Sequence, residues 1–331
     1  MRTIIQSVLR CSLHQPLSRQ RRFILLSGGA ALFTACTQTR KPQSVPSESS
    51  SQGVTTIQHA LGEADIPANP NRVVVWGYAM VDAVLALGVQ PVGVPGVILD
   101  EMAYLEWDRA AIASIGDAEQ PNLETLSTLD PDLILTTEQL GASSYPLLSQ
   151  VAPTVAFGID ERGEWRATAN LCAEALGKQT EAEKLSADYE SKLAQLKSQS
   201  SQSLQDIEAS IVYITPGEIR TMGAASFPGS VLRDAGLSRP SAQSQGPDRR
   251  NLSLESLNQI DGDVIFMLAP QSDSERAAGV RDEIKRVKAM PLWSQLKAVK
   301  NNQVYEVAPY WALGNYIAAD LMLDDLLAYL S

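Results

Sequence analysis

The 331-residue chain is 44% apolar and 20% charged, so it is too long for one small core and too apolar to be a disordered protein. Its 27 basic and 38 acidic residues give a formal charge of −11. Because nucleic-acid affinity comes from clustered Lys and Arg, this balance argues against a nucleic-acid partner. Three cysteines and two histidines leave little material for a zinc cluster or a disulfide framework.

The N-terminal residues carry the pattern of an export signal. Five arginines and no acid accompany an apolar run at residues 23–35, which is too short and too rich in glycine to span a bilayer. We therefore expect residues 1–35 to be a signal peptide. The choice between general secretory and twin-arginine export stays open, because Arg21-Arg22 lies closer to Phe23 than is typical of a twin-arginine signal.

The apolar run ends in Leu32-Phe33-Thr34-Ala35-Cys36, which resembles a bacterial lipoprotein signal with Phe33 in the place of the usual Leu. The resemblance implies that Cys36 carries a lipid that anchors the chain to the membrane. The alternatives are an ordinary cleaved signal or a buried free thiol. Residues 36–54 are rich in Ser, Gln and Pro, which favours a flexible tether. Loss of residues 1–35 removes five arginines and no acid, so the mature charge would be −16.

The first half of the body has the pattern of an α/β domain. Residues 72–76 and 89–94 are expected to be strands, and residues 82–88 between them have helical spacing with Gly88 as a stop. Two further buried strands are expected at residues 133–135 and 153–157. Strand, helix and strand at this spacing predict a parallel sheet with both faces covered, which we place in an N-terminal lobe over residues 55–160.

One long amphipathic helix is predicted over residues 180–196, because its apolar residues recur at steps of three and four with no Gly or Pro among them. Thr180 and Glu183 could form a capping box at its start. We expect the segment 161–207 to join the first lobe to a C-terminal α/β lobe over residues 208–331. That lobe is expected to begin with a strand at 211–214 and a helix at 229–236. The fold class is therefore α/β, with two Rossmann-like lobes.

An internal echo supports the two-lobe plan. Residues 123–135 and 254–266 share a Leu-Glu-x-Leu start, an Asp-x-Asp turn and a buried strand. The echo makes Glu124 and Glu255 equivalent positions of the two halves. Both acids are also favoured at a helix N-terminus by the helix dipole. Ligands commonly bind in clefts between such lobes.

Catalytic motifs are not apparent in the sequence. It contains no GxGxxG after a strand, no phosphate-binding GxxxxGK[ST], no GxSxG, no HExxH and no CxxC. His59 is interpreted as a surface residue, and Asp324-Asp325 as the solvent-facing side of an apolar helix. We expect no catalytic residue, no protein-ligated metal and no resident cofactor.

Loop arginines and aromatics are the candidate ligand residues, because α/β folds place ligands at the loops that follow strand ends. An arginine there offers a planar fork of donors to carboxylates and other oxyanions. Each could instead be a solvated Arg or a core aromatic. The candidates are Trp76, Tyr78, Arg162, Arg166, Arg220, Arg249, Arg250 and Trp311.

Ordered blocks across roughly residues 55–331 resemble the periplasmic iron–siderophore and cobalamin binding proteins of ABC importers. The blocks are Asn69-Pro70 with residues 72–75, then 82–88, 91–94, Gly116, 121–124, 130–134, 152–155, 292–300 and Val304-Tyr305. The resemblance implies two α/β lobes joined by one long helix, with a shallow cleft and little hinge motion. It also implies that Glu124 and Glu255 pair with arginines of the membrane permease.

The resemblance further implies a monomeric, periplasmic lipoprotein that captures a ferric siderophore and delivers it to the transmembrane subunits of an ABC permease. The siderophore would supply the iron ligands, and the loop arginines favour an anionic chelate. Cobalamin or haem remains open as the ligand. So do a cleft protein of the same plan with no transport role and a chelatase-like enzyme.

Overall fold

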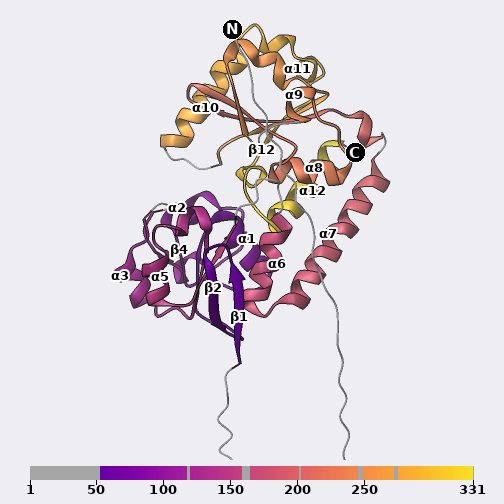
Figure 1. The fold of residues 1–331 in the computed structure, drawn as a ribbon. Helices are drawn as coiled ribbons and strands as arrows, with labels where there is room; N and C mark the ends of the chain where they lie inside the picture. The colour runs from indigo at the N-terminus through magenta and orange to yellow at the C-terminus, as the bar shows by residue number, and fades with distance from the viewer. Residues whose placement is uncertain are drawn as a thin grey trace, which may run out of the picture. The chain divides into compact units, whose positions relative to one another are not determined.

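The computed structural model describes residues 53–117, 120–158, 165–200, 203–244, 249–271 and 275–330 (Figure 1). The predicted signal peptide, Cys36, Arg162 and nearly all of the predicted tether lie outside these ranges, as does the side chain of Arg249. Among the described residues, no helix combines the length and apolarity needed to cross a bilayer.

The N-terminal lobe is built on a five-stranded sheet in the order β5-β4-β3-β6-β7, and every neighbouring pair is parallel. Its strands are β3 (Val73–Trp76), β4 (Gly93–Val94), β5 (Ala113–Ser114), β6 (Leu133–Thr137) and β7 (Thr154–Phe157). Its helices are α1 (Tyr78–Ala86), α2 (Gly96–Glu101), the 3-10 turn η1 (Arg109–Ala111), α3 (Leu123–Thr128), α4 (Glu138–Gly141) and α5 (Tyr145–Val151). The predicted parallel sheet is confirmed.

Two elements of this lobe begin four residues away from their predicted starts. The first helix begins at Tyr78, four residues before the expected Asp82, because the strand ends at Trp76 and Gly77 turns the chain directly into the helix. The helix stops as expected, and Gly88 follows it in the left-handed region at φ 79°. The second strand shrinks from residues 89–94 to Gly93–Val94.

The hairpin of β1 (Val54–His59) and β2 (Gly62–Pro67) was not predicted from the sequence. Its residues are mostly polar and exposed, and Ile57, Ala64 and Ile66 are its buried side chains. His59 is part-buried rather than on the open surface, with Nε2 3.1 Å from the Tyr145 hydroxyl. Its Nδ1 accepts the Leu61 amide, and burial lowers its pKa.

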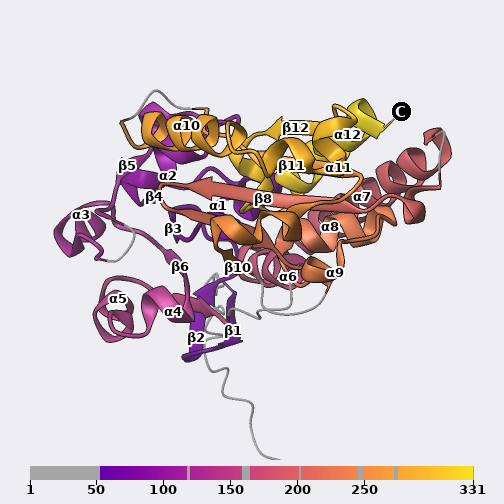
Figure 2. The same ribbon diagram turned by 90° about the horizontal axis from the view of Figure 1, so that it is seen from above.

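The C-terminal lobe has a sheet in the order β10-β9-β8-β11-β12 (Figure 2). β8, β11 and β12 are parallel, whereas β9 and β10 are antiparallel additions, so this second sheet is mixed. The strands are β8 (Ala209–Thr215), β9 (Glu218–Met222), β10 (Arg249–Leu252), β11 (Val264–Leu268) and β12 (Val304–Val307). β8 turns into β9 through Gly217, whose φ of 80° suits glycine.

Helices cover both faces of this second sheet. α8 (Phe227–Ala235) and α12 (Tyr316–Leu330) pack on the face that carries Ile211, Met222 and Phe266. α10 (Glu275–Lys288) packs on the opposite face, against Val212, Ile219 and Ile265. The remaining short elements are η2 (Leu204–Asp206), α9 (Ser241–Ser244), η3 (Leu254–Ile260), η4 (Trp293–Gln295), α11 (Lys297–Lys300) and η5 (Pro309–Trp311).

Two helices, α6 (Trp165–Leu176) and α7 (Gln179–Gln199), connect the first sheet to the second along the chain. The long helix predicted over residues 180–196 is therefore confirmed, and Figure 1 shows α7 running alongside both lobes. It buries Ala182, Tyr189, Leu193 and Leu196. The predicted capping box is wrong, because the helix begins one residue earlier than Thr180. Lys178 is the N-cap and has no side-chain cap hydrogen bond.

The internal echo has a structural meaning that extends beyond its helix and strand. Asp132 accepts the amides of Asn71 and Arg72 at 2.8 and 2.9 Å, at the entry to β3. In the other lobe, Asp263 accepts the Glu208 amide at 2.9 Å, at the entry to β8. The second Asp of each turn thus fixes the start of the neighbouring parallel strand.

A buried carboxylate ties α1 of the N-terminal lobe to the start of α12. Asp82 is fully buried and accepts the amides of Ile317 and Ala318, each at 3.0 Å, together with the Tyr104 hydroxyl at 3.1 Å. Burial raises the pKa of Asp82 to about 6, although these hydrogen bonds act in the opposite direction. The Asp82 side chain therefore links the first helix of the N-terminal lobe to the last helix of the chain's described part.

Candidate functional site

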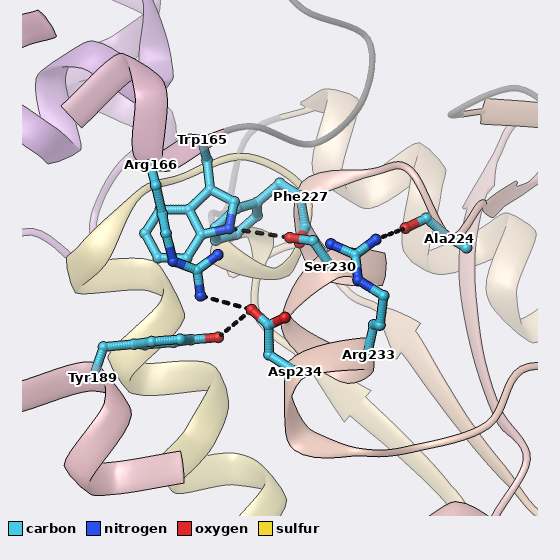
Figure 3. Close-up of polar contacts among 8 residues, drawn as sticks. All are labelled: Trp165, Arg166, Tyr189, Ala224, Phe227, Ser230, Arg233 and Asp234. Carbon is cyan, nitrogen blue, oxygen red and sulfur yellow. Dashed lines mark hydrogen bonds and ion pairs between the residues drawn. The ribbon is translucent and has the colours of Figure 1, made fainter. Parts of the chain in front are cut away.

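Arg166 lies at the junction of α6, α7 and α8 (Figure 3). Its Nη2 donates to Asp234 Oδ2 at 2.6 Å, and the Tyr189 hydroxyl reaches the same oxygen at 3.3 Å. The guanidinium also stacks on the rings of Trp165 and Tyr189, at 4.3 and 4.8 Å from their centroids. Its charge is therefore already balanced by Asp234.

The surroundings of Arg166 give it a positioning role. The Trp165 indole donates to Ser230 Oγ at 3.0 Å, so two consecutive residues of α6 bind two residues of α8. The ion pair raises the pKa of Arg166 against the effect of burial, so the guanidinium stays cationic. Sequence reasoning placed Arg166 on a ligand, whereas its partner Asp234 lies 68 residues away in the chain.

The turn between β9 and α8 packs against the first turn of α8, which requires glycine at position 229. A Cβ there would lie 2.1 Å from the carbonyl oxygen of Gly223. We expect Gly229→Ala to lower the free energy of unfolding by about 3 kcal/mol, because the clash is with backbone. Gly217→Ala is the control, since no atom lies within 4 Å of its Cβ and its cost is limited to backbone strain. Urea unfolding of both variants measures the difference, and an equal loss would contradict the clash.

Arg220 lies on β9 in the row Tyr213–Arg220–Asn251, which crosses β8, β9 and β10. Directly opposed residues share a face of a sheet, so these three side chains lie on one face. Arg220 pairs with Glu218 through Nη2, and its Nε is buried with no hydrogen-bond partner among the described residues. Its guanidinium is therefore only partly satisfied.

Arg250 does not share that face. It pairs with Thr221, the residue after Arg220, and successive residues of a strand point to opposite faces. Arg250 is exposed. Arg220 and Arg250, which the sequence grouped on one ligand, thus lie on the paired strands β9 and β10 (the β9–β10 ribbon). Their side chains point to opposite faces of the sheet.

Arg239 is a residue that sequence reasoning missed. It follows α8, and its Nη2 donates to the Met222 carbonyl at 2.5 Å and to Gln243 Oε1 at 2.7 Å. Its Nε and Nη1 are buried and have no partner among the described residues. Burial lowers its pKa to about 10. The only sequence signal was its charge in a short Arg-Pro loop, which is too common to select it.

The two predicted tryptophans are core residues. Trp76 is 1% exposed, because a parallel strand with both faces covered buries every side chain along it. Trp311 is 0% exposed, stacks on Phe266 at 4.5 Å and donates to Asp325 at 2.7 Å. Asp325 therefore accepts a hydrogen bond from a core residue. The predicted solvent-facing side of this helix includes Asp324, which is exposed, but not Asp325. The alternative that these aromatics belong to the core is the one the structure supports.

Tyr78 is half-buried at the start of α1, and its hydroxyl donates to Glu101 at 2.8 Å. Glu101 also meets Arg276 of α10 at 3.2 Å, so this small network reaches from one lobe to the other. Burial and the Glu101 carboxylate raise the Tyr78 pKa, which keeps the phenol protonated.

Glu124 and Glu255 occupy matching places. Each is exposed and lies in the first turn of its element, Glu124 in α3 and Glu255 in η3.

Cys172, the one cysteine among the described residues, is buried, and burial raises the pKa of its thiol. A pocket of about 360 Å³ opens beside β2 and α5, lined in part by Glu63, Asp65 and Tyr145, and it contains none of the predicted ligand residues.

Comparison with known proteins identifies the family. The model described as "Periplasmic binding protein" matches residues 73–310, and the chain belongs to this family. The resemblance inferred from the ordered sequence blocks is thereby confirmed.

Two relatives that match most of this chain are named as binding proteins. The chain is 31% identical over 310 residues to the "Probable siderophore-binding lipoprotein YfiY" of Bacillus subtilis (strain 168), covering 90% of this chain and 94% of that protein. It is 31% identical over 267 residues to the achromobactin-binding periplasmic protein of Dickeya dadantii (strain 3937), covering 78% and 85%.

Among solved structures, Staphylococcus aureus SirA complexed with staphyloferrin B matches with a TM-score of 0.73 and 30% identity, over 83% of this chain and 98% of that one. FeuA of Bacillus subtilis complexed with ferri-bacillibactin has a TM-score of 0.69 at 23% identity, over 83% and 98%, and supports the fold. The two-lobed α/β architecture expected from the sequence is confirmed.

Proposed function

We propose that this chain is an extracytoplasmic lipoprotein that captures a ferric siderophore between its two lobes and delivers it to an ABC permease. The observation that carries the proposal is the partly satisfied Arg220 on the β9–β10 ribbon of a chain whose net charge is −11. An arginine with a free donor suits an anionic cargo, because charged oxygens accept strong hydrogen bonds from a guanidinium. The name of one relative, a probable siderophore-binding lipoprotein, supports a siderophore as the cargo.

The proposal divides the predicted ligand residues by their surroundings. Arg220 is the central contact, and Tyr78, Arg162 and Arg249 remain proposed contacts, whereas Arg250 is set aside because it points to the opposite face of the sheet from Arg220. Arg166 serves to position α8 through Asp234. The siderophore supplies the ligands of the iron, so the protein contributes hydrogen bonds and charge rather than metal coordination.

The remaining parts of the proposal concern membrane and partner. Residues 1–35 direct export, Cys36 carries the lipid anchor, and residues 36–54 tether a monomeric body. The lobes occupy residues 55–160 and 208–331, joined by the segment 161–207. Glu124 and Glu255 dock on the transmembrane subunits of the permease.

Fluorescence titration tests the cargo. The five tryptophans of the chain provide the signal, and the probes are ferric citrate, a ferric trihydroxamate, a ferric tris-catecholate, haem and cobalamin. We expect saturable quenching by at least one ferric chelate and a weaker response to the same siderophore without iron. Binding of haem or cobalamin alone would replace the cargo, and no binding by any probe would refute a transport role.

The anchor has its own test. Expressed with its signal in a bacterial host, the wild-type chain is expected to partition into detergent, whereas Cys36→Ser is expected to partition into the aqueous phase. Intact-mass measurement of the detergent fraction gives the lipid. Equal partitioning of the two chains would contradict lipidation at Cys36.

A further inference from the structure

An ion pair joins the two lobes through long, exposed side chains. Arg276 is the second residue of α10 in the C-terminal lobe, and its Nη1 lies 3.2 Å from Oε1 of Glu101, the last residue of α2. The two residues are 175 positions apart in the chain. Their side chains are 74% and 42% exposed, so water reaches the pair. Figures 1 and 2 show α2 and α10 on the same side of the molecule, one in each lobe.

Glu101 divides its two oxygens between the lobes. Oε2 accepts the Tyr78 hydroxyl at 2.8 Å within the N-terminal lobe, and Oε1 pairs with Arg276 of the other lobe. Tyr78 begins α1 after the carboxyl end of β3, and α10 follows the carboxyl end of β11. Because α/β folds bind ligands beyond the carboxyl ends of their parallel strands, Glu101 connects the ligand-binding edges of the two sheets.

A second join between the lobes is buried. Asp82 lies one helical turn after Tyr78 on α1, and its carboxylate accepts two backbone amides at the start of α12. Tyr104, which follows Glu101 closely in the chain, donates to the same carboxylate. Helix α1 and the segment 101–104 therefore each contribute one residue to the exposed join and one to the buried join.

The two joins differ in what breaking them costs. Asp82 is fully buried, and loss of its bonds would leave two amides and a hydroxyl without an acceptor. The exposed pair of Glu101 and Arg276 can exchange its contact for water at little cost, because exposed ion pairs contribute little to stability. The buried join can thus act as a pivot while the exposed join opens and closes.

We propose that Glu101 and Arg276 form a latch between the lobes, and that Glu101 is a positioning residue whose engagement by Arg276 fixes the Tyr78 hydroxyl for the cargo. Arg276 holds Glu101 and does not itself contact the cargo. An open latch frees Glu101 and Tyr78 to reorient, so the cargo leaves more easily. The inference rests on the proposed function for its cargo, whereas the latch itself can be measured without any cargo.

A distance measurement without cargo tests the latch. The full chain, with Cys11→Ser and Cys36→Ser to remove other labelling sites, carries spin labels at Ser149→Cys in α5 and Ser294→Cys in η4. Both positions are exposed, and they lie in different lobes. The buried Cys172 is left in place. Electron–electron double resonance then gives the distribution of distances between the two labels.

The labelled chain is expected to give a narrow distance distribution that Arg276→Gln broadens. Salt at about 1 M should broaden it in the same way, because it screens an exposed ion pair. Tyr78→Phe should leave the distribution unchanged, since Glu101 and Arg276 still pair. A distribution that neither Arg276→Gln nor salt alters would overturn the latch.

The rate of cargo dissociation tests the positioning role. It is measured by stopped-flow tryptophan fluorescence with ferric citrate, a ferric trihydroxamate and a ferric tris-catecholate as probes. Glu101→Gln and Arg276→Gln should each speed the dissociation of a bound probe about threefold, the factor expected for one exposed ion pair. The double variant should be no faster than either single variant, because both changes remove the same contact.

The effect should pass through Tyr78. In a Tyr78→Phe background, Arg276→Gln should change the dissociation rate by about twofold at most, because no hydroxyl is left to position. A full effect in that background would overturn the positioning role. If Arg276 instead contacted an anionic cargo, Arg276→Gln would speed dissociation, whereas Glu101→Gln would remove a nearby negative charge and slow it. Opposite signs would therefore overturn the inference.

Lys285→Gln is the matched control, because Lys285 is an exposed cation of the same helix whose partner, Asp282, also belongs to that helix. It should leave both the distances and the dissociation rates unchanged, and a change equal to that of Arg276→Gln would overturn the latch. Failure of every ferric probe to bind would remove the proposed function, whereas the distances measured without cargo would still decide the latch.

Discussion

Asp82→Ala is expected to lower the free energy of unfolding by about 3 kcal/mol at pH 7, because it leaves two amides of α12 and the Tyr104 hydroxyl buried without their acceptor. The loss should act on both lobes, since the carboxylate belongs to α1 and the amides belong to α12. Urea unfolding followed by circular dichroism measures it. Asp320→Ala is the control, since Asp320 lies on α12 with a 55% exposed side chain paired to Lys192.

The loss should also depend on pH. Burial raises the pKa of Asp82 to about 6, above the ordinary value of 3.8. The folded state therefore binds a proton more tightly than the unfolded chain, and the stability linked to that proton is fully present below 3.8 and disappears as pH rises through 6. The cost of Asp82→Ala should thus be about 1 kcal/mol larger at pH 5 than at pH 7. A cost that is equal at both pH values would contradict a buried, proton-binding Asp82.

The elements that sequence could predict are those set by local pattern. The apolar runs at β3, β6, β7 and β8 and the period of α7 were visible because burial of a strand or a helix face repeats along the chain. The antiparallel β9 and β10 were not visible as sheet strands, because their residues mix Arg, Glu, Asn and Thr. The β1–β2 hairpin was hidden for the same reason, since three buried side chains are a weak signal.

The candidate site depended on contacts that local pattern cannot show. Arg166 and Asp234 are separated by 68 residues, and Asp82 meets α12 across 235 residues. Trp76 illustrates the opposite error: it ends a strand, as expected of a ligand residue, but full coverage of the sheet encloses it. The arginines were found by their charge and by their place in loops near predicted strand ends, so their partners, and hence their roles, had to come from the structure.

The internal echo was the sequence feature with the widest structural consequence. It placed equivalent helices before β6 and β11, and the structure adds that Asp132 and Asp263 anchor the equivalent strands β3 and β8. The same repeat sets Glu124 and Glu255 at equivalent exposed positions on the two lobes. A repeated acid on two lobes is therefore a product of the repeated fold as well as a candidate contact.

Reversing both charges, Glu124→Arg with Glu255→Arg, is expected to reduce chelate uptake at least about tenfold, because like charges across an interface cost several kcal/mol. Neither side chain lies in the Arg220 row, so the affinity for the ferric chelate should stay within twofold of wild type. Each change also puts a cation in the first turn of a helix, at a stability cost of about 0.5–1 kcal/mol. Uptake of radio-iron chelate by cells that express the cognate permease provides the measurement.

Glu138→Arg separates docking from this helix effect, because Glu138 is also exposed and also lies in the first turn of its helix, α4. It should have the same small stability cost and normal uptake. Normal uptake by the double variant would rule out docking through Glu124 and Glu255, whereas loss of chelate affinity would move these residues to the ligand site. Because binding and uptake are measured on the same variants, the result distinguishes a docking pair from acids that serve only the two helices.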